Sequence, residues 1–271
     1  MYDIIVVGGG PAGLSAAISA RQRGNSVAVI SNDKTKSGLY KARLVENYPG
    51  FPGISGAELL NKLSAHAADA GAELLSGQVN TVFPYGGAFQ VGFDNDILES
   101  KSVILATGVV QTSLFPGEEE LLGRGVSYCA TCDGRLYKGK RICVVCLSHD
   151  ADKEADYLES IGCEVVRTGS KDIVIRGENR VSSVVVDGEV IDCAGVFILR
   201  HAIAPHLLLA GLETEDGYIK AAPSGETNIA GVFAAGDCVG DPLQIAKAVG
   251  QGQLAALSAS DHIYKKGIRI E

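Results

Sequence analysis

Two cysteines three residues apart form the most chemically suggestive pair in the chain. Cys129 and Cys132 stand in the stretch Cys-Ala-Thr-Cys-Asp-Gly, residues 129–134. This spacing can close a small disulfide ring, and such bonds are easily reduced and typical of catalytic dithiols. Asp133 follows directly, where a carboxyl group can donate a proton to a thiolate or accept one from a thiol. The three residues therefore predict dithiol redox chemistry.

A second cysteine pair leaves another interpretation open. Cys143 and Cys146 extend the pattern to C-x2-C-x10-C-x2-C, which superficially resembles a zinc ribbon. This pair lies in an apolar strand pattern, however, where residues three apart point to opposite faces. We therefore interpret both as buried thiols and expect no metal site. The same interpretation applies to the other cysteines, which are Cys163, Cys193 and Cys238.

Composition narrows the class of protein. The chain has 271 residues and a net charge of −8, which argues against non-specific nucleic-acid binding. Its seven cysteines favour redox or metal chemistry over a structural disulfide framework. Its apolar runs have the length of strands, so we expect no membrane span. A strand pattern begins at residue 2 and leaves no room for a signal peptide, which predicts a cytoplasmic protein.

The chain begins with elements that could position a nucleotide. Asp3–Val7 reads as a buried parallel strand, residues 14–23 as an alanine-rich helix and Ser26–Ile30 as a second strand. Between the first strand and the helix stands G-x-G-x-x-G. In this motif Gly8 permits the tight turn, Gly10 lets the backbone approach a pyrophosphate and Gly13 allows the helix to pack closely on the strand. The helix N-terminus then faces the phosphate.

Two later segments fit the same domain. Val103–Gly108 is an apolar strand that ends in small residues, and Gly231–Asp237 is another strand that ends in an acid. A helix of small residues is expected over about 244–262. The pieces of one nucleotide domain therefore stand at both ends of the chain, with an insert between them that begins near the cysteine pair.

Together these motifs resemble the low-molecular-weight thioredoxin reductases. The resemblance runs nearly the whole chain in family order and rests on five motifs: GGGPAG (8–13), ENYPG (46–50), ATG (106–108), CATCDG (129–134) and GVFAAGD (231–237). It implies an α/β fold of two Rossmann-like, three-layer ββα domains. The discontinuous FAD-binding domain would be 1–112 and 202–271. Residues 113–201 would be a shortened pyridine-nucleotide-type domain that carries the dithiol.

The resemblance also implies roles for individual residues. Cys132 would be the sulfur on the flavin side, Cys129 the sulfur that attacks thioredoxin and Asp133 the acid–base group. Asp237 would contact the ribityl or phosphate region of FAD, and Asn47 would lie near the flavin. Gln244 and Ile245 would contact the isoalloxazine ring. The full set of implied cofactor-binding residues is Gly8, Gly10, Pro11, Ala12, Gly13, Ser31, Asn47, Val79, Thr107, Gly108, Asp237, Gln244 and Ile245.

The insert departs from the family pattern at three places that would bind NADPH. Its strand-to-helix turn, residues 145–151, contains no glycine, and Asp150 and Asp152 would repel a phosphate there. The family's basic cluster is reduced to Arg167, and Arg200-His201 replaces a glycine after the last strand. This combination resembles the ferredoxin-dependent flavin thioredoxin reductases. It implies ferredoxin as electron donor, thioredoxin as substrate and a homodimer.

Three alternatives stay open on the sequence alone. The insert could hold a remodelled NADPH or NADH pocket, with Arg167 and Arg200 as phosphate ligands. It could bind a second flavin. The chain could also be a flavin-bearing redox sensor whose dithiol switches without turnover, although Asp133 beside the cysteines favours turnover.

Overall fold

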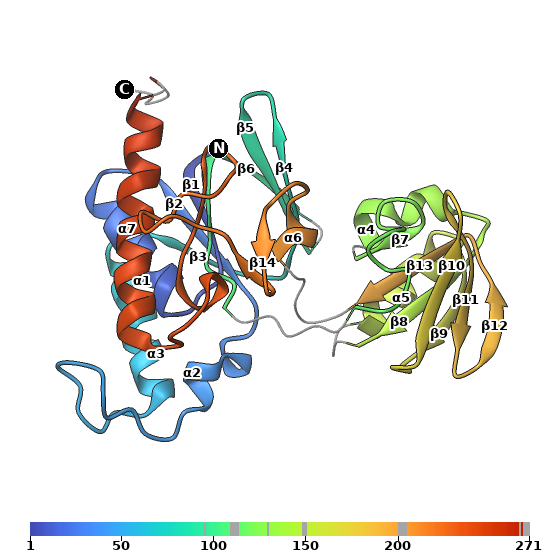
Figure 1. The fold of residues 1–271 in the computed structure, drawn as a ribbon, viewed down its shortest axis with the longest axis horizontal. Helices are drawn as coiled ribbons and strands as arrows, with labels where there is room; N and C mark the ends of the chain where they lie inside the picture. Colours follow the sequence, from blue (N-terminus) through green and yellow to red (C-terminus); the bar gives the residue numbers. More distant parts are fainter. Residues whose placement is uncertain are drawn as a thin grey trace. The chain divides into compact units, whose positions relative to one another are not determined.

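The chain forms two compact units, each with its own parallel sheet (Figure 1). The computed structural model describes residues 1–94, 96–108, 114–128, 130–147, 151–199, 205–265 and 267. The first unit combines Met1–Val110 with Ala204–Glu271, and the second is Gln111–Ile203. The first unit is therefore split in the sequence, and the second is inserted into it.

The first unit is built on parallel strands that are buried on both faces. The strand order is β3-β2-β1-β6, and β16 also pairs with β6. Residues Ile4–Val7 of β1 are buried without alternation, as expected for a strand covered on both sides. The strands are β1 (Tyr2–Val7), β2 (Val27–Ser31), β3 (Glu73–Ser76), β6 (Asp96–Leu105) and β16 (Val232–Ala234).

The long strand β6 belongs to two arrangements. Its first half pairs antiparallel with β5 (Ala88–Phe93), which pairs in turn with β4 (Val79–Tyr85). Its second half runs parallel to both β1 and β16. Strand β6 therefore connects the antiparallel strands β4 and β5 to the parallel sheet.

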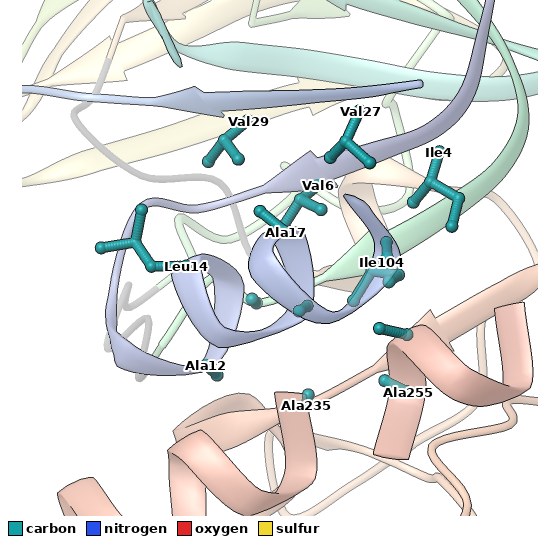
Figure 2. Close-up of a cluster of buried hydrophobic side chains, with 14 of the residues drawn as sticks. Ile4, Val6, Ala12, Leu14, Ala17, Val27, Val29, Ile104, Ala235 and Ala255 are labelled. Atoms are coloured by element: carbon teal, nitrogen blue, oxygen red, sulfur yellow. The ribbon is translucent and has the colours of Figure 1, made fainter. Parts of the chain in front are cut away.

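Small residues bring two helices of the first unit close together. Helix α1 (Pro11–Gln22) packs against α7 (Ile245–Lys265), which carries the C-terminal part of the chain back to the N-terminal motif. A Cβ atom at Gly252 of α7 would collide with the carbonyl oxygen of Ala12. Figure 2 shows the core around α1, with Ala12 on the side that faces Ala235 and Ala255, and Leu14 on the side that faces the strand side chains such as Val29.

Shorter elements complete the first unit. Helix α3 also packs against α1, and the Ser55 hydroxyl accepts a hydrogen bond from the backbone N–H of Glu58 at its N-terminus. The remaining elements are η1 (Lys34–Lys36), α2 (Gly38–Lys41), α3 (Gly56–Asp69), α6 (Pro205–Leu208), β14 (Thr214–Glu215), β15 (Tyr218–Ile219) and η3 (Gly236–Val239).

The second unit has three layers. A parallel sheet of order β7-β13-β8-β9 is covered on one side by α5 and faces the antiparallel sheet β10-β11-β12 through β11. Ile142, Val144 and Phe197 of the parallel sheet pack with Leu158 of α5 in a buried cluster. Its strands are β7 (Val126–Ser127), β8 (Arg141–Cys146), β9 (Glu164–Thr168), β10 (Ile173–Gly177), β11 (Val181–Val186), β12 (Glu189–Asp192) and β13 (Gly195–Leu199). Its helices are α4 (Ala130–Asp133), η2 (Gly134–Tyr137) and α5 (Ala151–Ser160).

In the part of the chain that the structure describes, no helix combines the length and the apolar character that crossing a bilayer requires.

Candidate functional site

The carboxyl ends of the central strands in the first unit meet at one edge of the sheet. Backbone hydrogen bonds continue past the strand ends, from Gly8 N to Ile30 O at 2.8 Å and from Ala235 N to Leu105 O at 3.0 Å. Gly8 thus follows β1, Thr107 follows β6 and Asp237 follows β16. In open parallel sheets, ligands bind in the crevice outside these carboxyl ends.

The three glycines that define the G-x-G-x-x-G motif are required for different steric reasons. Gly8 has φ +113° and lies so close to the Ala106 carbonyl that a Cβ atom would collide with it. A Cβ atom at Gly13 would collide with the Gly8 carbonyl oxygen, because α1 approaches β1 closely. A Cβ atom at Gly10 would meet no atom within 4 Å. The turn is therefore tight at both ends and open in the middle, as a pyrophosphate requires.

Pro11 and Ala12 begin the helix that faces this opening. Pro11 occupies the first helical turn, where its missing N–H costs nothing, and the first helical hydrogen bond runs from Leu14 N to Gly10 O at 2.9 Å. The remaining N–H groups of that turn have no acceptor within the helix and point towards its N-terminus. The chain thus offers backbone donors beside the open position at Gly10.

Two buried polar atoms at the same edge lack a partner among the described residues. They are Thr107 Oγ1 and Asp237 Oδ1. The Thr107 hydroxyl lies beside the Cys238 thiol but meets no partner at hydrogen-bond geometry. Burial raises the pKa of Asp237, Lys247 opposes that change and Asp241 adds to it. Buried polar atoms normally find partners, so this edge fits a ligand with hydroxyl or phosphate groups, as FAD has.

Lys247 of α7 holds the loop that presents Asp237. Its Nζ atom donates to the carbonyl oxygens of Gly236, at 3.3 Å, and Gly240. Both ends of η3 are therefore held by one ammonium group, which also lowers the pKa of Asp237 against the effect of burial. The sequence analysis did not single out Lys247. The available signal was a charged residue in the first turn of a helix otherwise rich in small residues.

Two implied flavin-ring residues, 197 positions apart in the chain, contact each other. The side-chain amide of Asn47 donates to Gln244 Oε1 at 2.9 Å. Ile245, the first residue of α7, packs against the buried cluster of Val45, Ile54 and Leu59. The fold thus brings Asn47, Gln244 and Ile245 to one place.

The other implied cofactor-binding residues also lie near the ends of strands. Ser31 ends β2, and a Cβ atom at Gly9 would lie 2.7 Å from its Oγ atom. Gly108 has φ +71° and open space around it. Val79 begins β4, and its side chain is buried in the core. A cofactor contact by Val79 would therefore use its backbone.

The predicted dithiol segment lies in the second unit. Cys129 and the side chain of Cys132 lie outside the described part of the structure, whereas the backbone of α4 and the Asp133 side chain are described. Ser127 Oγ donates to Asp133 Oδ2 at 2.7 Å. This contact joins the residues that precede and follow the cysteine pair, and the sequence analysis did not foresee it.

The expectation that both cysteines of the second pair are buried holds for Cys143, whereas Cys146 is only half-buried. Cys146 packs on the same buried cluster as Ile142 and Val144, whereas Cys143 is fully buried outside that cluster, as alternation along β8 requires. Burial raises the pKa of the Cys143 thiol to about 12, with smaller contributions from Cys193 and Cys146. A zinc ribbon needs both sulfurs to point to one place, and the strand geometry opposes that.

Acidic residues follow the nucleotide-type turn of the second unit. Residues 148–150 lie outside the described structure, but α5 begins at Ala151 with Asp152 and Glu154 in its first turn. Arg167 of β9 pairs at the surface with three α5 carboxylates, at 2.7 Å from Asp156, 3.0 Å from Glu159 and 3.8 Å from Asp152. The guanidinium therefore already has anionic partners. Arg200, the other basic residue of the alternative pocket, lies outside the described residues.

Comparison with known proteins places the chain in a family. The model of the pyridine nucleotide-disulphide oxidoreductase family matches residues 2–168 and 146–252. The chain is also 31% identical to the thioredoxin reductase of Bacillus subtilis, over 97% of this chain and 95% of the relative. It belongs to the pyridine nucleotide-disulphide oxidoreductase family. Within that family it is homologous to thioredoxin reductases.

Solved structures of the family have the same fold. A ferredoxin-flavin thioredoxin reductase from Clostridium acetobutylicum superposes with a TM-score of 0.84 at 39% identity, covering 97% of this chain and 98% of that one. A thioredoxin reductase from Gloeobacter violaceus gives a TM-score of 0.73 at 26% identity, covering 99% and 95%. The predicted fold class, two Rossmann-like units of which one is split in the sequence, is confirmed.

Proposed function

We propose that this member of the pyridine nucleotide-disulphide oxidoreductase family is an FAD-dependent thioredoxin reductase that takes its electrons from reduced ferredoxin. The first unit binds FAD and the second carries the Cys129–Cys132 dithiol. The observation that carries the proposal is the joint presence of an FAD-fitting edge, a CATCDG segment and a nucleotide-type unit whose Arg167 is paired with carboxylates. The likeness to a ferredoxin-flavin enzyme supports the choice of donor.

The residues of the first unit are suited to hold FAD in three places. The backbone around Gly10 and the start of α1 would hold the pyrophosphate, and Asp237 Oδ1 would accept a hydroxyl of the ribityl chain. The Asn47–Gln244 pair with Ile245 would lie at the ring. Ser31, Val79, Thr107 and Gly108 would complete the nucleotide side. When bound, FAD supplies a group that accepts single electrons and delivers pairs.

The dithiol would connect that electron pair to a protein substrate. Two electrons entering at Cys132 break the Cys129–Cys132 bond and leave two sulfur anions, one of which takes a proton from Asp133. The Cys129 thiolate then attacks the thioredoxin disulfide, forms a mixed disulfide and releases one thioredoxin sulfur. Cys132 attacks that mixed disulfide after Asp133 removes its proton, which restores the Cys129–Cys132 bond and frees reduced thioredoxin.

The charges of the second unit argue against NADPH as donor. A 2′-phosphate would have to displace at least one carboxylate from Arg167 and would meet the negative charges of Asp152 and Asp156. The first turn of α5 carries Asp152 and Glu154, whereas a phosphate site at a helix N-terminus depends on a positive local field. The start of α5 therefore carries negative charge, which would repel a phosphate group.

An anaerobic donor comparison tests the proposal. Purified protein loaded with FAD is mixed with thioredoxin and either enzymatically reduced ferredoxin or NADPH, and the new thioredoxin thiols are counted. We expect turnover with ferredoxin and none above background with NADPH. The Cys129→Ser and Cys132→Ser variants should lose turnover. Fast reduction with NADPH alone would refute the choice of donor, and unaffected cysteine variants would favour the redox-sensor alternative.

Direct binding measurements separate the remaining alternatives. Calorimetry with NADPH and NADH, on the wild type and on Arg167→Ala, should show no binding at millimolar concentration. Tight binding that Arg167→Ala abolishes would support the remodelled pocket. Counting FAD per chain in the denatured holoprotein should give one, and a value of two would support a second flavin in the second unit.

The proposal extends to assembly and location. We expect a homodimer, by resemblance to the family, and a cytoplasmic enzyme, because an easily reduced CxxC dithiol and its thioredoxin partner work under reducing conditions. Light scattering on the eluting full-length holoprotein tests the first expectation: a mass of one chain would contradict it. Fractionation of the source cells tests the second.

A further inference from the structure

The short strand β7 leads directly into the dithiol segment. Val126 and Ser127 pair in parallel with Val196 and Phe197 of β13, so this segment is fixed to the parallel sheet. The Ser127 side chain is 3% exposed. A group that Ser127 binds is therefore held at a fixed position relative to the sheet and away from bulk water.

The group that Ser127 binds is the carboxylate implied in proton transfer. Its Oγ atom donates to Asp133 Oδ2 at 2.7 Å, within the range of a charge-assisted O–H···O⁻ hydrogen bond. In sequence, Ser127 stands two residues before Cys129, and Asp133 directly follows Cys132. One hydrogen bond therefore joins a residue before the cysteine pair to the residue after it.

The neighbouring residue is anchored by a second carboxylate. The Tyr128 hydroxyl donates to Glu118 Oε1 at 2.9 Å, and Phe115 N donates to Glu118 Oε2 at 2.8 Å. Glu118 is fully buried. A buried carboxyl group needs hydrogen-bond partners, and the contact with Tyr128 fixes the chain immediately before Cys129. Both residues ahead of the dithiol are thus held through their side chains.

We propose that Ser127 is a positioning residue of the redox site: its hydroxyl holds the Asp133 carboxyl group in the orientation from which it exchanges a proton with the dithiol. The inference rests on the proposed function. Ser127 itself transfers no proton and continues to donate to Oδ2. Asp133 gives one proton to a sulfur anion when the disulfide opens, and takes one from a thiol when that sulfur attacks a disulfide.

Among the described residues, Tyr137 of η2 interacts electrostatically with Asp133. Burial raises the pKa of Tyr137, the Asp133 charge adds to that and Arg180 opposes it. Tyr157 of α5 and Cys163 lie near Gly134, and Cys163 Sγ lies 3.7 Å from the Gly134 carbonyl oxygen. Cys129 and Cys132 are the groups with which Asp133 exchanges protons.

A half-reaction measures the role of Ser127 without thioredoxin or an electron donor. The dithiol of the full-length protein is reduced chemically, freed of reductant and mixed with a small aromatic disulfide, and release of the coloured thiolate is followed against pH. We expect Ser127→Ala to change the shape of the rate profile against pH, because the Asp133 carboxyl group loses the hydrogen bond that fixes its orientation. The Cys129→Ser/Cys132→Ser double variant gives the background from the other thiols.

Matched variants separate positioning from general damage. Ser127→Thr keeps a hydroxyl and should keep the wild-type profile, whereas Ser127→Val, which is isosteric with the threonine variant, should not. This pair keeps the test available even if Ser127→Ala fails to fold. Ser170→Ala removes a similar serine–aspartate contact elsewhere in the unit, 2.6 Å from Ser170 Oγ to Asp187 Oδ1, and should change nothing. Adding Ser127→Ala to Asp133→Asn should cause no further change.

Three outcomes would overturn the inference. They are a wild-type pH profile in Ser127→Ala, an equal loss of rate at every pH with no change in the shape of the profile, and full additivity of Ser127→Ala with Asp133→Asn. The proposed function fails on a different result, the absence of thioredoxin reduction by the wild type. Because the half-reaction needs no thioredoxin, that failure would leave the role of Ser127 measurable.

Discussion

Gly10 and Gly13 stand in one turn, yet a methyl group would act differently at each. Gly10 has φ −82°, and a Cβ atom there meets no atom within 4 Å, so the fold can accept alanine. We expect Gly10→Ala to change unfolding free energy by less than about 0.5 kcal/mol and to weaken FAD binding at least about tenfold, because the methyl group fills the approach of the pyrophosphate. Titration of flavin-free protein with FAD measures the second effect.

Gly13→Ala provides the contrasting variant. Its Cβ atom would collide with the Gly8 carbonyl oxygen, so α1 would have to move away from β1. We expect a loss of about 1–3 kcal/mol of stability in flavin-free protein, measured by urea unfolding. If Gly10→Ala bound FAD like the wild type, or was as unstable as Gly13→Ala, the pyrophosphate would not approach this turn as proposed.

Lys247 has a role at the residue scale that motif patterns do not reveal. It bridges the carbonyls of Gly236 and Gly240 and lowers the pKa of Asp237 against the effect of burial. We expect Lys247→Met to weaken FAD binding about tenfold, by loss of the clamp. The pKa of Asp237 should rise, so as pH falls the variant should begin to lose FAD at a higher pH than the wild type.

A pH series of FAD titrations measures both effects of Lys247→Met. Lys265→Met removes a lysine from the exposed end of the same helix and should leave affinity and its pH dependence unchanged. Equal effects of the two variants would show that the net charge of α7 matters and not the contact with η3.

The candidate site was predictable where its chemistry depends on consecutive residues. The turn from Gly8 to Gly13 and the pair Cys129 and Cys132 with Asp133 are local patterns, and each implies its chemistry directly. Contacts between distant residues left no such signal. The Asn47–Gln244 hydrogen bond and the Lys247 clamp exist because β16 and α7 return to β1, which is a property of the whole sheet.

At the element scale, hydrophobic periodicity predicted the central strands well and their partners poorly. The expected strands at 3–7 and 26–30 appear as β1 (Tyr2–Val7) and β2 (Val27–Ser31), because runs buried on both faces are distinctive. The helix expected over 244–262 ends at Lys265. No local sequence pattern predicted that β6 joins an antiparallel pair at one end and a parallel sheet at the other, because strand pairing depends on residues far along the chain.

The contact between β1 and β6 includes a nearly buried ion pair. Lys101 Nζ lies 2.8 Å from Asp3 Oδ1, and the two side chains are 5% and 20% exposed. Burial alone would raise the pKa of Asp3, but hydrogen bonds from Lys101 and Ser26 lower it below its ordinary value. A carboxyl group with a lowered folded pKa stabilises the fold above its unfolded pKa, and that contribution disappears as pH falls through the folded pKa.

Lys101→Met should therefore destabilise the first unit in a pH-dependent way. We expect the free energy of unfolding to fall by about 2–3 kcal/mol at neutral pH, because the Asp3 charge stays half-buried without Lys101. Below about pH 4, where Asp3 is protonated in the unfolded chain, the difference from the wild type should be smaller. Lys62→Met breaks the exposed pair with Glu58 and should cost about 0.5 kcal/mol or less. Urea unfolding at several pH values checks both; a pH-independent loss in Lys101→Met would contradict the electrostatic account.

At the scale of the whole molecule, each unit has its own buried cluster. The first unit is organised around Ile4, Val6 and Ile104, and the second around Ile142, Val144 and Phe197. The residues that fit FAD all belong to the first unit, and the dithiol segment belongs to the second. A cofactor that binds only one of two separately cored units stabilises that unit directly and leaves the other to its own stability.

FAD should therefore move one of two thermal transitions. In calorimetry of flavin-free full-length protein we expect two thermal transitions. Added FAD should move one of them to higher temperature, because at a hundredfold excess over the dissociation constant it stabilises the unit that binds it by about 2.7 kcal/mol. The Gly10→Ala variant should require more FAD for the same shift. A destabilising change in the second core, such as Phe197→Leu, should lower only the other transition, since its ring is fully buried there. A single transition that moved as one with FAD and with Phe197→Leu would show that the units unfold together.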